Sequence, residues 1–245
     1  MTPSISIITT AYNSQATIAD AIISVLNQTY APIEYFIMDG GSTDSTIAIA
    51  ESYRSAFEQK GVRYTVASEK DNGVYDAMNK GISRASGEVI GMINSDDWYE
   101  PHAVYTAVST FATTDCDMMF GNLRIHTKGK CIIKRVKNKP WVTSRNWNHP
   151  TTFTRRTIHM EHPFPCQSLY DDFDLYVKLR KTECRIVTVD DILANFRTGG
   201  MSNHRSMAFA FERFWVRYRI YRKNKYSVFY FLECLFVEFG KYVLS

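Results

Sequence analysis

Two adjacent carboxylates, Asp96 and Asp97, are the residues of this 245-residue chain that point most directly to chemistry. They follow a short apolar run at 89–93 that predicts a β-strand. Like charges at this spacing repel each other unless a cation neutralises them. Oxygen ligands suit a hard divalent ion, Mg²⁺ or Mn²⁺, which also takes oxygens from a substrate diphosphate. The alternative is a solvated turn that caps a helix starting near Pro101.

A third carboxylate, Asp39, ends another predicted strand at 33–38. In nucleotide-binding sheets a carboxylate at this place contacts a ribose hydroxyl or a base edge. The competing interpretation is an Asx turn or a helix cap, a role that Ser42 and Asp44 fit equally well. The chain has no G-x-G-x-x-G after its first predicted strand and no G-x-x-x-x-G-K-[ST]. Dinucleotide oxidoreductases and P-loop enzymes are therefore poor fits, whereas a nucleotide whose diphosphate is held by metal remains.

Alternating strands and helices position these polar residues. Apolar spacing predicts strands at 4–10, 33–38, 62–67 and 89–93, and helices at 15–28, from Ser42 or Asp44 to Phe57, and at 74–84. This alternation implies right-handed crossovers and a mostly parallel sheet. Ligands of such sheets bind outside the carboxyl ends of the strands. The polar clusters at 10–13, 39–44 and 94–97 are expected to converge there.

The pattern is looser beyond Pro101. It predicts strands at 118–125 and 131–136 joined by a turn at 127–130, and a helix at 171–181 after a loop with two prolines. These elements suggest a second lobe that completes a cleft. From Met207 onward, apolar residues at helical spacing predict two amphipathic helices.

Composition and charge exclude several classes of protein. With 45% hydrophobic residues the chain can bury a sizeable core, so it is not a disordered protein. Five cysteines without C-x-x-C spacing argue against a disulfide framework and a zinc cluster, and indicate reduced thiols in a cytosolic protein. The net charge of +4 is concentrated in the tail from Arg205, which argues against a nucleic-acid-coating role for the whole protein. No secretory signal or transmembrane helix is expected.

Four ordered motifs resemble the signatures of the family 2 inverting glycosyltransferases. They are TAYN at 10–13, DGGSTD at 39–44, EKDNG at 69–73 followed by YDAMNKG at 75–81, and NSDD at 94–97. The resemblance covers about residues 4–200. It implies an α/β protein of the GT-A fold, with a Rossmann-like, mostly parallel sheet, a mixed acceptor-side lobe and C-terminal helices. Within it, 1–100 is the expected nucleotide-sugar-binding half, 101–205 the acceptor-binding and catalytic half of the same domain, and 206–245 the amphipathic helices.

The resemblance also assigns roles to single residues. Position by position, the implied nucleotide-sugar contacts are Thr10, Tyr12, Asp39, Asp71, Asp96 and His149. Asp97 is the implied ligand of Mn²⁺ or Mg²⁺, with Asp96 second. Asn94 departs from the family pattern, because an Asp frequently stands there. His149 precedes a proline, and an ordinary loop residue is the alternative reading for it.

A later acidic motif, DDFDL at 171–175, resembles the family segment whose second carboxylate is the catalytic base, which selects Asp172. Such a base removes the proton of an acceptor hydroxyl as the hydroxyl attacks the anomeric carbon opposite the diphosphate. One displacement inverts the anomeric configuration. The alternative is charge at a helix N-terminus, which favours Asp171 and Asp172 equally.

The implied function is transfer of a sugar from a nucleotide-diphosphate donor, a UDP-sugar in particular, to a hydroxyl of a glycan or lipid-linked oligosaccharide in polysaccharide biosynthesis. A non-catalytic nucleotide-sugar or glycan-binding module is the alternative, and nucleotidyl transfer lacks the basic glycine-rich loop it needs. The segment 197–205 resembles a flexible loop that closes over the diphosphate, with a simple Gly-Gly turn as its alternative. The basic, aromatic tail suits either a peripheral contact with the inner face of the cytoplasmic membrane or an ordinary packed helix pair.

Overall fold

The computed structural model describes residues 2–127, 129–198 and 207–243. The first part of the chain alternates strands and helices, as the sequence predicts. Its elements are β1 (Ile5–Ala11), α1 (Ile18–Leu26), β2 (Glu34–Asp39), α2 (Thr46–Ser52), α3 (Arg54–Gln59), β3 (Arg63–Ser68), α4 (Val74–Arg84) and β4 (Val89–Met92). The four strands pair in parallel, in the order β3-β2-β1-β4. Every residue of β1, β2 and β4 is buried, because helices cover both faces of a parallel sheet.

One predicted helix is wrong in its extent. The single helix expected to run to Phe57 is divided at Tyr53, which ends α2 and precedes α3. The second segment turns so that Phe57 becomes fully buried and stacks on Tyr64 with the ring centroids 4.5 Å apart. Burial of this aromatic side chain outweighs continuation of one straight helix.

The rest of the chain extends the same sheet with mixed pairing. Its elements are β5 (Trp98–Tyr99), α5 (Ala103–Thr113), β6 (Met118–Thr127), β7 (Lys130–Lys134), η1 (Ser144–Asn146), η2 (His149–Thr151), β8 (Thr152–Arg155), α6 (Arg156–Glu161), α7 (Asp171–Leu179) and β9 (Ile186–Arg197). Beyond β4 the sheet continues as β8-β6-β9-β5, and β7 pairs with β6. Strand β8 is antiparallel to β4 and β6, while β9 is parallel to β6. The carboxyl ends of β1–β4, β6 and β9 therefore share one edge, and the α/β fold class is confirmed.

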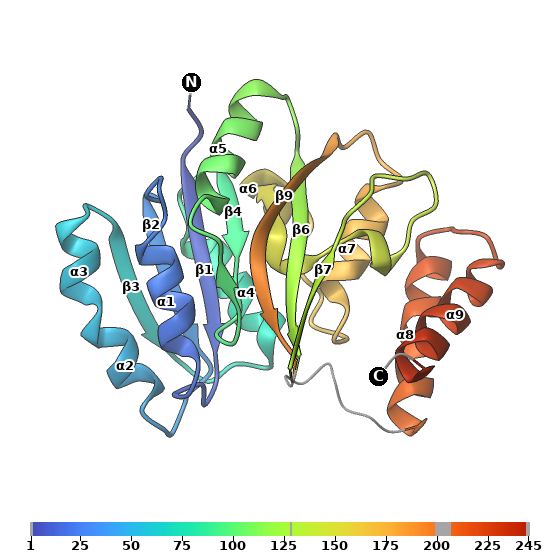
Figure 1. Cartoon of the computed structure of the whole chain (residues 1–245), viewed down its shortest axis with the longest axis horizontal. Helices are drawn as coiled ribbons and strands as arrows, with labels where there is room; N and C mark the ends of the chain where they lie inside the picture. The colour runs from blue at the N-terminus through green and yellow to red at the C-terminus, as the bar shows by residue number, and fades with distance from the viewer. Residues whose placement is uncertain (1, 128, 199–206, 244–245) are drawn as a thin grey trace.

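Two hydrophobic clusters cover the two faces of this sheet. One combines side chains of α1, α3 and α5 with the sheet, and the other combines α4, α6, α7 and the C-terminal helices with it. Figure 1 shows this layered arrangement. Because helices of the first half and the second half pack on each face, the sheet is one rigid platform for side chains at its edge.

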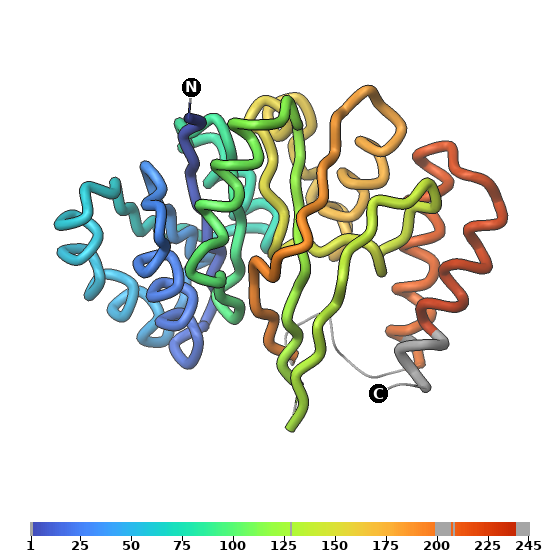
Figure 2. Tube along the Cα trace, turned by 45° about the horizontal axis from the view of Figure 1, so that its top comes forward, coloured from blue at the N-terminus to red at the C-terminus, as the bar shows by residue number. Residues whose placement is uncertain are grey.

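Two amphipathic helices, α8 (Met207–Lys223) and α9 (Tyr230–Val243), end the described chain, as expected. They lie at the opposite end of the molecule from α2 and α3 (Figures 1 and 2). Their inner faces pack on the body: Tyr221 meets Phe173 of α7 edge to face, with ring centroids 5.7 Å apart, and Arg217 lies over the ring of Tyr170. Lys223 forms an ion pair of 2.6 Å with Asp174.

The helix pair also holds the backbone of the segment before η1. The hydroxyl of Tyr221 donates to the Val142 carbonyl at 3.0 Å, and the Val142 amide donates to the Tyr230 hydroxyl at 3.2 Å. The ring of Trp141 stacks on Tyr230 at 4.3 Å between centroids. The helix pair is therefore joined to the segment that leads to η2.

Candidate active site

The residues after β1 and β4 meet at the carboxyl edge of the sheet. The Thr10 hydroxyl donates to Asn94 Oδ1 at 3.2 Å, and the Ser95 amide donates to the Thr10 carbonyl at 3.2 Å. Tyr12 extends outward from this edge and is 64% exposed. The structure thus brings the first and third polar clusters together and leaves the ring of Tyr12 accessible.

Asp39 is 2% exposed and accepts hydrogen bonds from its own surroundings. Its Oδ2 accepts from the amides of Gly41 and Ser42 at 3.0 and 2.8 Å and from the Ser68 hydroxyl at 2.7 Å. The Ser42 hydroxyl donates to Oδ1. These bonds make Asp39 the organiser of the loop after β2, the turn role that the sequence left open beside nucleoside contact.

Asp71 lies against the same loop. A Cβ placed on Gly40 would come within 2.6 Å of Asp71 Oδ2, so only glycine permits this approach. Asp71 Oδ1 accepts from the Gly73 amide at 2.9 Å, where Gly73 has φ of 112°. Asp39 and Asp71 are therefore close neighbours at the ends of β2 and β3, separated by the bare backbone of Gly40.

Asp97 is fully buried and only half satisfied. Its Oδ1 accepts from the Arg197 amide at 3.1 Å, whereas its Oδ2 is buried without a hydrogen-bond partner among the described residues. Burial raises the pKa of Asp97 well above its ordinary value, and the neighbouring charge of Asp96 adds to the shift. Burial also raises the pKa of Asp96, which the charge of Arg197 opposes. A cation at this pair would reverse both effects.

The donor set fits a divalent ion that is shared with a substrate. Among the described residues no group of three or more His, Cys, Asp or Glu side chains is placed to hold a metal by itself. Asp97 and Asp96 offer carboxylate oxygens, one of them buried and unpaired. Mg²⁺ and Mn²⁺ accept such a small protein contribution when phosphate oxygens and water complete the shell.

The acidic motif at the start of α7 separates into three different roles. Asp171 turns back and accepts from the amides of Gln167 and Ser168 at 2.9 and 3.0 Å. Asp174 pairs with Lys223 of α8. Asp172 alone lines the cavity in front of α7, together with side chains of β4, η2 and β8. The helical phase therefore singles out the middle carboxylate of the three.

Asp172 is held by two neighbours from distant parts of the chain. The Tyr75 hydroxyl of α4 donates to its Oδ1 at 2.8 Å, and His149 Nδ1 lies 3.2 Å from its Oδ2. Burial, with the charge of Asp172 as the next cause, raises the pKa of Tyr75 well above its ordinary value, so the phenol keeps its proton. Burial lowers the pKa of His149, although Asp172 opposes this shift. A neutral imidazole and a phenol therefore orient one carboxylate.

The structure places His149 beside Asp172, on the α7 side of the edge. His149 begins the short helix η2, which immediately precedes β8. The sequence analysis did not select Tyr75 or His159 as site residues. His159 lines the same cavity as Asp172 and His149. Tyr75 stands in the YDAMNKG motif at 75–81, so its signal was present but carried no role. His159 had no signal, because its importance depends on a fold-level contact.

Three further features were considered in the sequence: the loop at 197–205, the cysteines and the possibility of a transmembrane helix. The loop expected at 197–205 lies mostly outside the described residues, which stop at Thr198 and resume at Met207. All five cysteines are free. Within the described ranges, no helix has the length and apolar character needed to cross a membrane.

Comparison with known proteins gives the family. The glycosyl transferase family 2 model matches residues 6–175. An uncharacterized glycosyltransferase of Nostoc sp. is 29% identical over 224 residues, which cover 84% of this chain and 68% of that protein. A chondroitin synthase of Escherichia coli is 30% identical over 187 residues, covering 72% of this chain and 26% of the synthase. The chain thus spans about a quarter of the length of that larger relative.

Solved structures agree on the fold. Staphylococcus aureus TarS in complex with UDP aligns with a TM-score of 0.69 at 19% identity, over 99% of this chain and 72% of that one. A mannosyltransferase of Pyrobaculum calidifontis, in complex with GDP-Man and Mn²⁺, aligns with a TM-score of 0.71 at 18% identity, over 91% and 64%. The GT-A architecture expected from the motifs is thus confirmed. With the family model matching most of its length, the chain belongs to glycosyl transferase family 2.

Proposed function

We propose that this glycosyltransferase moves a sugar from a nucleotide-diphosphate donor to a hydroxyl of a glycan or lipid-linked oligosaccharide, with inversion. The observation that carries the proposal is Asp172, the one carboxylate of its motif that lines a cavity and is oriented by Tyr75 and His149. That cavity also includes Met92, the last residue of β4, four residues before Asp96. In this proposal the base and the diphosphate-binding pair act on the same donor.

Asp172 acts as the general base in this proposal. Its carboxylate accepts the proton of the acceptor hydroxyl while that oxygen attacks the anomeric carbon. The Tyr75 hydroxyl donates a hydrogen bond to the carboxylate and His149 Nδ1 lies 3.2 Å from it, so little reorientation is needed when the acceptor binds. Asp97, with Asp96 second, holds the divalent ion. When bound, Mn²⁺ or Mg²⁺ stabilises negative charge on the leaving diphosphate.

The donor end of the site is formed by the first hundred residues. Thr10, Tyr12, Asp39 and Asp71 surround the nucleoside in this proposal, with Asp96 at the ribose or diphosphate. Asp39 contributes by shaping the loop at 39–42 around Gly40, because its oxygens already accept four hydrogen bonds. A UDP-sugar is the proposed donor. TarS in complex with UDP-GlcNAc shows a GT-A protein that accommodates such a molecule.

Polysaccharide biosynthesis is the proposed context. Relatives that share 28–30% identity with this chain include chondroitin synthases and a hyaluronan synthase. We also propose a division of the chain into three parts. Residues 1–100 bind the nucleotide sugar, 101–205 bind the acceptor and carry the base, and 206–245 are the C-terminal helical part. The proposed location is the cytoplasm, at the inner face of its membrane.

The experiment that tests the activity is release of free nucleoside diphosphate from a panel of donors. Purified chain is incubated with UDP-, GDP- and TDP-sugars plus short glycan acceptors, with Mn²⁺, with Mg²⁺ or with a chelator. We expect acceptor-dependent release from one donor class that the chelator abolishes. Donor binding by calorimetry without turnover under any condition would instead establish the non-catalytic module.

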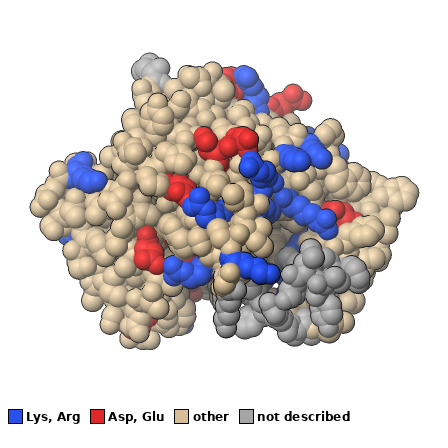
Figure 3. Space-filling view, in the orientation of Figure 1, with Lys and Arg blue, Asp and Glu red and all other residues tan. Residues whose placement is uncertain are grey.

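The outer face of α8 and α9 supports the membrane part of the proposal. Nine large apolar side chains of the two helices and the turn between them are 37–70% exposed: Met207, Phe211, Trp215, Val228, Phe229, Phe231, Leu232, Leu235 and Phe236. Exposed cations, Arg219, Arg222 and Lys225, lie toward the turn between the helices. The right-hand end of the molecule in Figure 3, over α9, carries few charged side chains. An apolar face beside cations suits an anionic lipid surface.

Co-sedimentation with vesicles tests this contact. Because the inner faces are packed, deleting the helices would damage the body, so we propose Phe229→Ser with Phe236→Ser on the outer face. The matched control is Ile132→Ser with Ile133→Ser on β7, where the side chains are 53% and 45% exposed. We expect the wild type and the control to bind phosphatidylglycerol vesicles at low salt, and the α9 variant to lose binding about tenfold or more.

Two outcomes would overturn the membrane contact. The first is that wild-type protein does not co-sediment with phosphatidylglycerol vesicles at low salt. A concentration-dependent dimer that disappears in the α9 variant is the other, because a second copy of the chain would then cover this face. Melting temperatures of both variants should equal that of the wild type, since the substituted side chains are exposed.

A further inference from the structure

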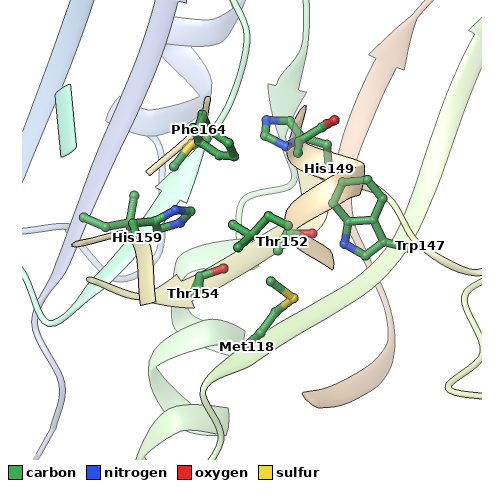
Figure 4. A pocket seen from close by; sticks show the side chains of 11 residues that line it. Met118, Trp147, His149, Thr152, Thr154, His159 and Phe164 are labelled. Carbon is green, nitrogen blue, oxygen red and sulfur yellow. Dashed lines mark ion pairs between the residues drawn. The ribbon is translucent and has the colours of Figure 1, made fainter. Parts of the chain in front are cut away.

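Behind Asp172 lies a small cavity with two unpaired histidine nitrogens. Its volume is about 20 Å³, enough for one water molecule. His149 Nε2 and His159 Nδ1 are buried without a hydrogen-bond partner among the described residues, and both rings line this cavity. Figure 4 shows His159 reaching in from one side and His149 from the other, with Thr152 and Thr154 of β8 between and below them.

The contact with Asp172 decides which nitrogen of His149 carries the proton. A carboxylate oxygen accepts, so the position of Nδ1, 3.2 Å from Asp172 Oδ2, favours the tautomer with the proton on Nδ1. In the neutral ring Nε2 is then a bare acceptor directed at the cavity. Burial lowers the pKa of His159 to about 3, with the charge of His149 as a further cause, so His159 is also neutral at pH 7. A neutral His159 can present Nδ1–H as a donor.

We propose that one water molecule occupies this cavity, accepts from His159 Nδ1–H and donates to His149 Nε2, which makes His159 a positioning residue for Asp172. The bridge satisfies both buried nitrogens with one molecule and fixes the His149 ring in the tautomer that donates to Asp172. This inference rests on the proposed function only in naming Asp172 as the base. The bridge itself depends on the cavity and on the two rings.

The groups that face Asp172 show why this support matters. Tyr75 donates to one carboxylate oxygen from α4, and His149 approaches the other from η2. Asp171, on the same helix, adds negative charge nearby but is occupied by the amides of Gln167 and Ser168. The Phe173 amide also donates to Oδ1, at 2.7 Å, so among the described residues His149 is the neighbour that approaches Oδ2. If His149 rotated, its contact with Asp172 Oδ2 would be lost.

Two substitutions of His159 separate a positioning role from a packing role. His159→Leu keeps an apolar side chain and removes the donor, whereas His159→Asn places an amide nitrogen close to the position of Nδ1. We expect His159→Leu to lower kcat about tenfold, as loss of an outer partner does. KM for the donor should stay within about twofold, because the donor does not contact His159 in this proposal. His159→Asn should restore most of kcat.

Nitrogen-15 NMR of the histidine rings tests the bridge without any activity measurement. Wild-type protein should show His149 with Nδ1 protonated and Nε2 bare, and His159→Leu should show a mixture of tautomers. A high-resolution crystal structure should show water within hydrogen-bond distance of both nitrogens. Should His159→Leu fail to fold, that water and the tautomer in wild-type protein still decide the question.

The outcomes distinguish this inference from the proposed function. An unchanged His149 tautomer and unchanged kcat in a folded His159→Leu variant would overturn the bridge, as would a dry cavity in the crystal. If the tautomer responds to His159→Leu while Asp172→Asn leaves sugar transfer intact, the bridge stands and the base assignment fails.

Discussion

The two Asp-Asp pairs of this chain, 96–97 after β4 and 171–172 at the start of α7, have the same composition and opposite surroundings. At the first pair, Asp97 is buried, its Oδ2 has no partner among the described residues, and burial also raises the pKa of the neighbouring Asp96. At the second pair, every carboxylate oxygen has a neighbour: three donors surround Asp171, and Tyr75 and His149 hold Asp172.

This difference separates two uses of a carboxylate. The first pair is electrostatically incomplete, so it gains by taking a cation from solution. The second pair is complete within the protein, which suits a base that must keep one geometry through the reaction. The surroundings that each fold position supplies, and not the Asp-Asp dipeptide, define the two roles. Each prediction below tests one side of this contrast.

The largest effect is expected at Asp172. Asp172→Asn keeps the shape of the side chain but cannot accept the acceptor's proton, so kcat should fall by about 10² or more. Affinity for the donor should be nearly unchanged, because the substitution lies away from the first pair. Steady-state kinetics with the donor found by the release assay measure both quantities.

Asp174→Asn is the matched control for Asp172, since it lies on the same helix and pairs with Lys223. It should keep near-normal turnover. The opposite result, with Asp172→Asn active and Asp174→Asn or Asp171→Asn inactive, would show that the catalytic register within α7 is wrong.

The second effect concerns the first pair. Asp97→Asn should abolish the Mn²⁺-dependent part of UDP binding, measured by calorimetry, and Asp96→Asn should weaken it less because Asp96 is the secondary ligand. Asp172→Asn should bind UDP and Mn²⁺ as the wild type does. Wild-type affinity in Asp97→Asn would remove the metal from this pair.

Stability without metal should move in opposite directions at the two pairs. Asp97→Asn removes a buried charge that lacks a partner, so the free energy of unfolding should stay equal or rise slightly. Asp171→Ala leaves three donors unpaired, among them the Ser168 hydroxyl, and should cost about 1–2 kcal/mol. Urea unfolding in chelator measures both. Destabilisation by Asp97→Asn in chelator would mean that the metal-free pair is already satisfied.

The smallest effect is a pH dependence that belongs to the second pair. His159 titrates at about 3 in the folded chain against 6.5 unfolded, so the folded state binds fewer protons between these values. The contribution of the neutral His159 ring to the free energy of unfolding is complete above pH 6.5 and is lost as the pH falls toward 3. Between pH 7 and pH 6 this amounts to roughly 0.7 kcal/mol. Urea unfolding at both values should show a smaller pH slope in His159→Asn than in the wild type; an equal slope would contradict the buried neutral ring.

The sequence predicted the parallel half of the fold well, because its strands are short, mainly apolar runs that alternate with helical patterns. It missed β5 and β8, which are two and four residues long and carry no periodicity of their own. Partners brought together by the fold were also out of reach: Tyr75 meets Asp172 across 97 positions. The residue types of Asp171, Asp172 and Asp174 do not distinguish them; the family resemblance selects Asp172, and the helical phase against the body gives each a different neighbour.

The hydrogen bonds of Tyr221 and Tyr230 with the Val142 backbone limit which C-terminal helices this protein can carry. Val142 lies seven residues before His149, so the C-terminal hairpin and the support of the base share one stretch of backbone. The two C-terminal helices therefore cannot be replaced independently of this segment. A chimera that carries the C-terminal helices of a relative needs one hydroxyl for the Val142 carbonyl and another for the Val142 amide. Without them we expect the segment after Val142 to shift and to move the His149 imidazole away from Asp172.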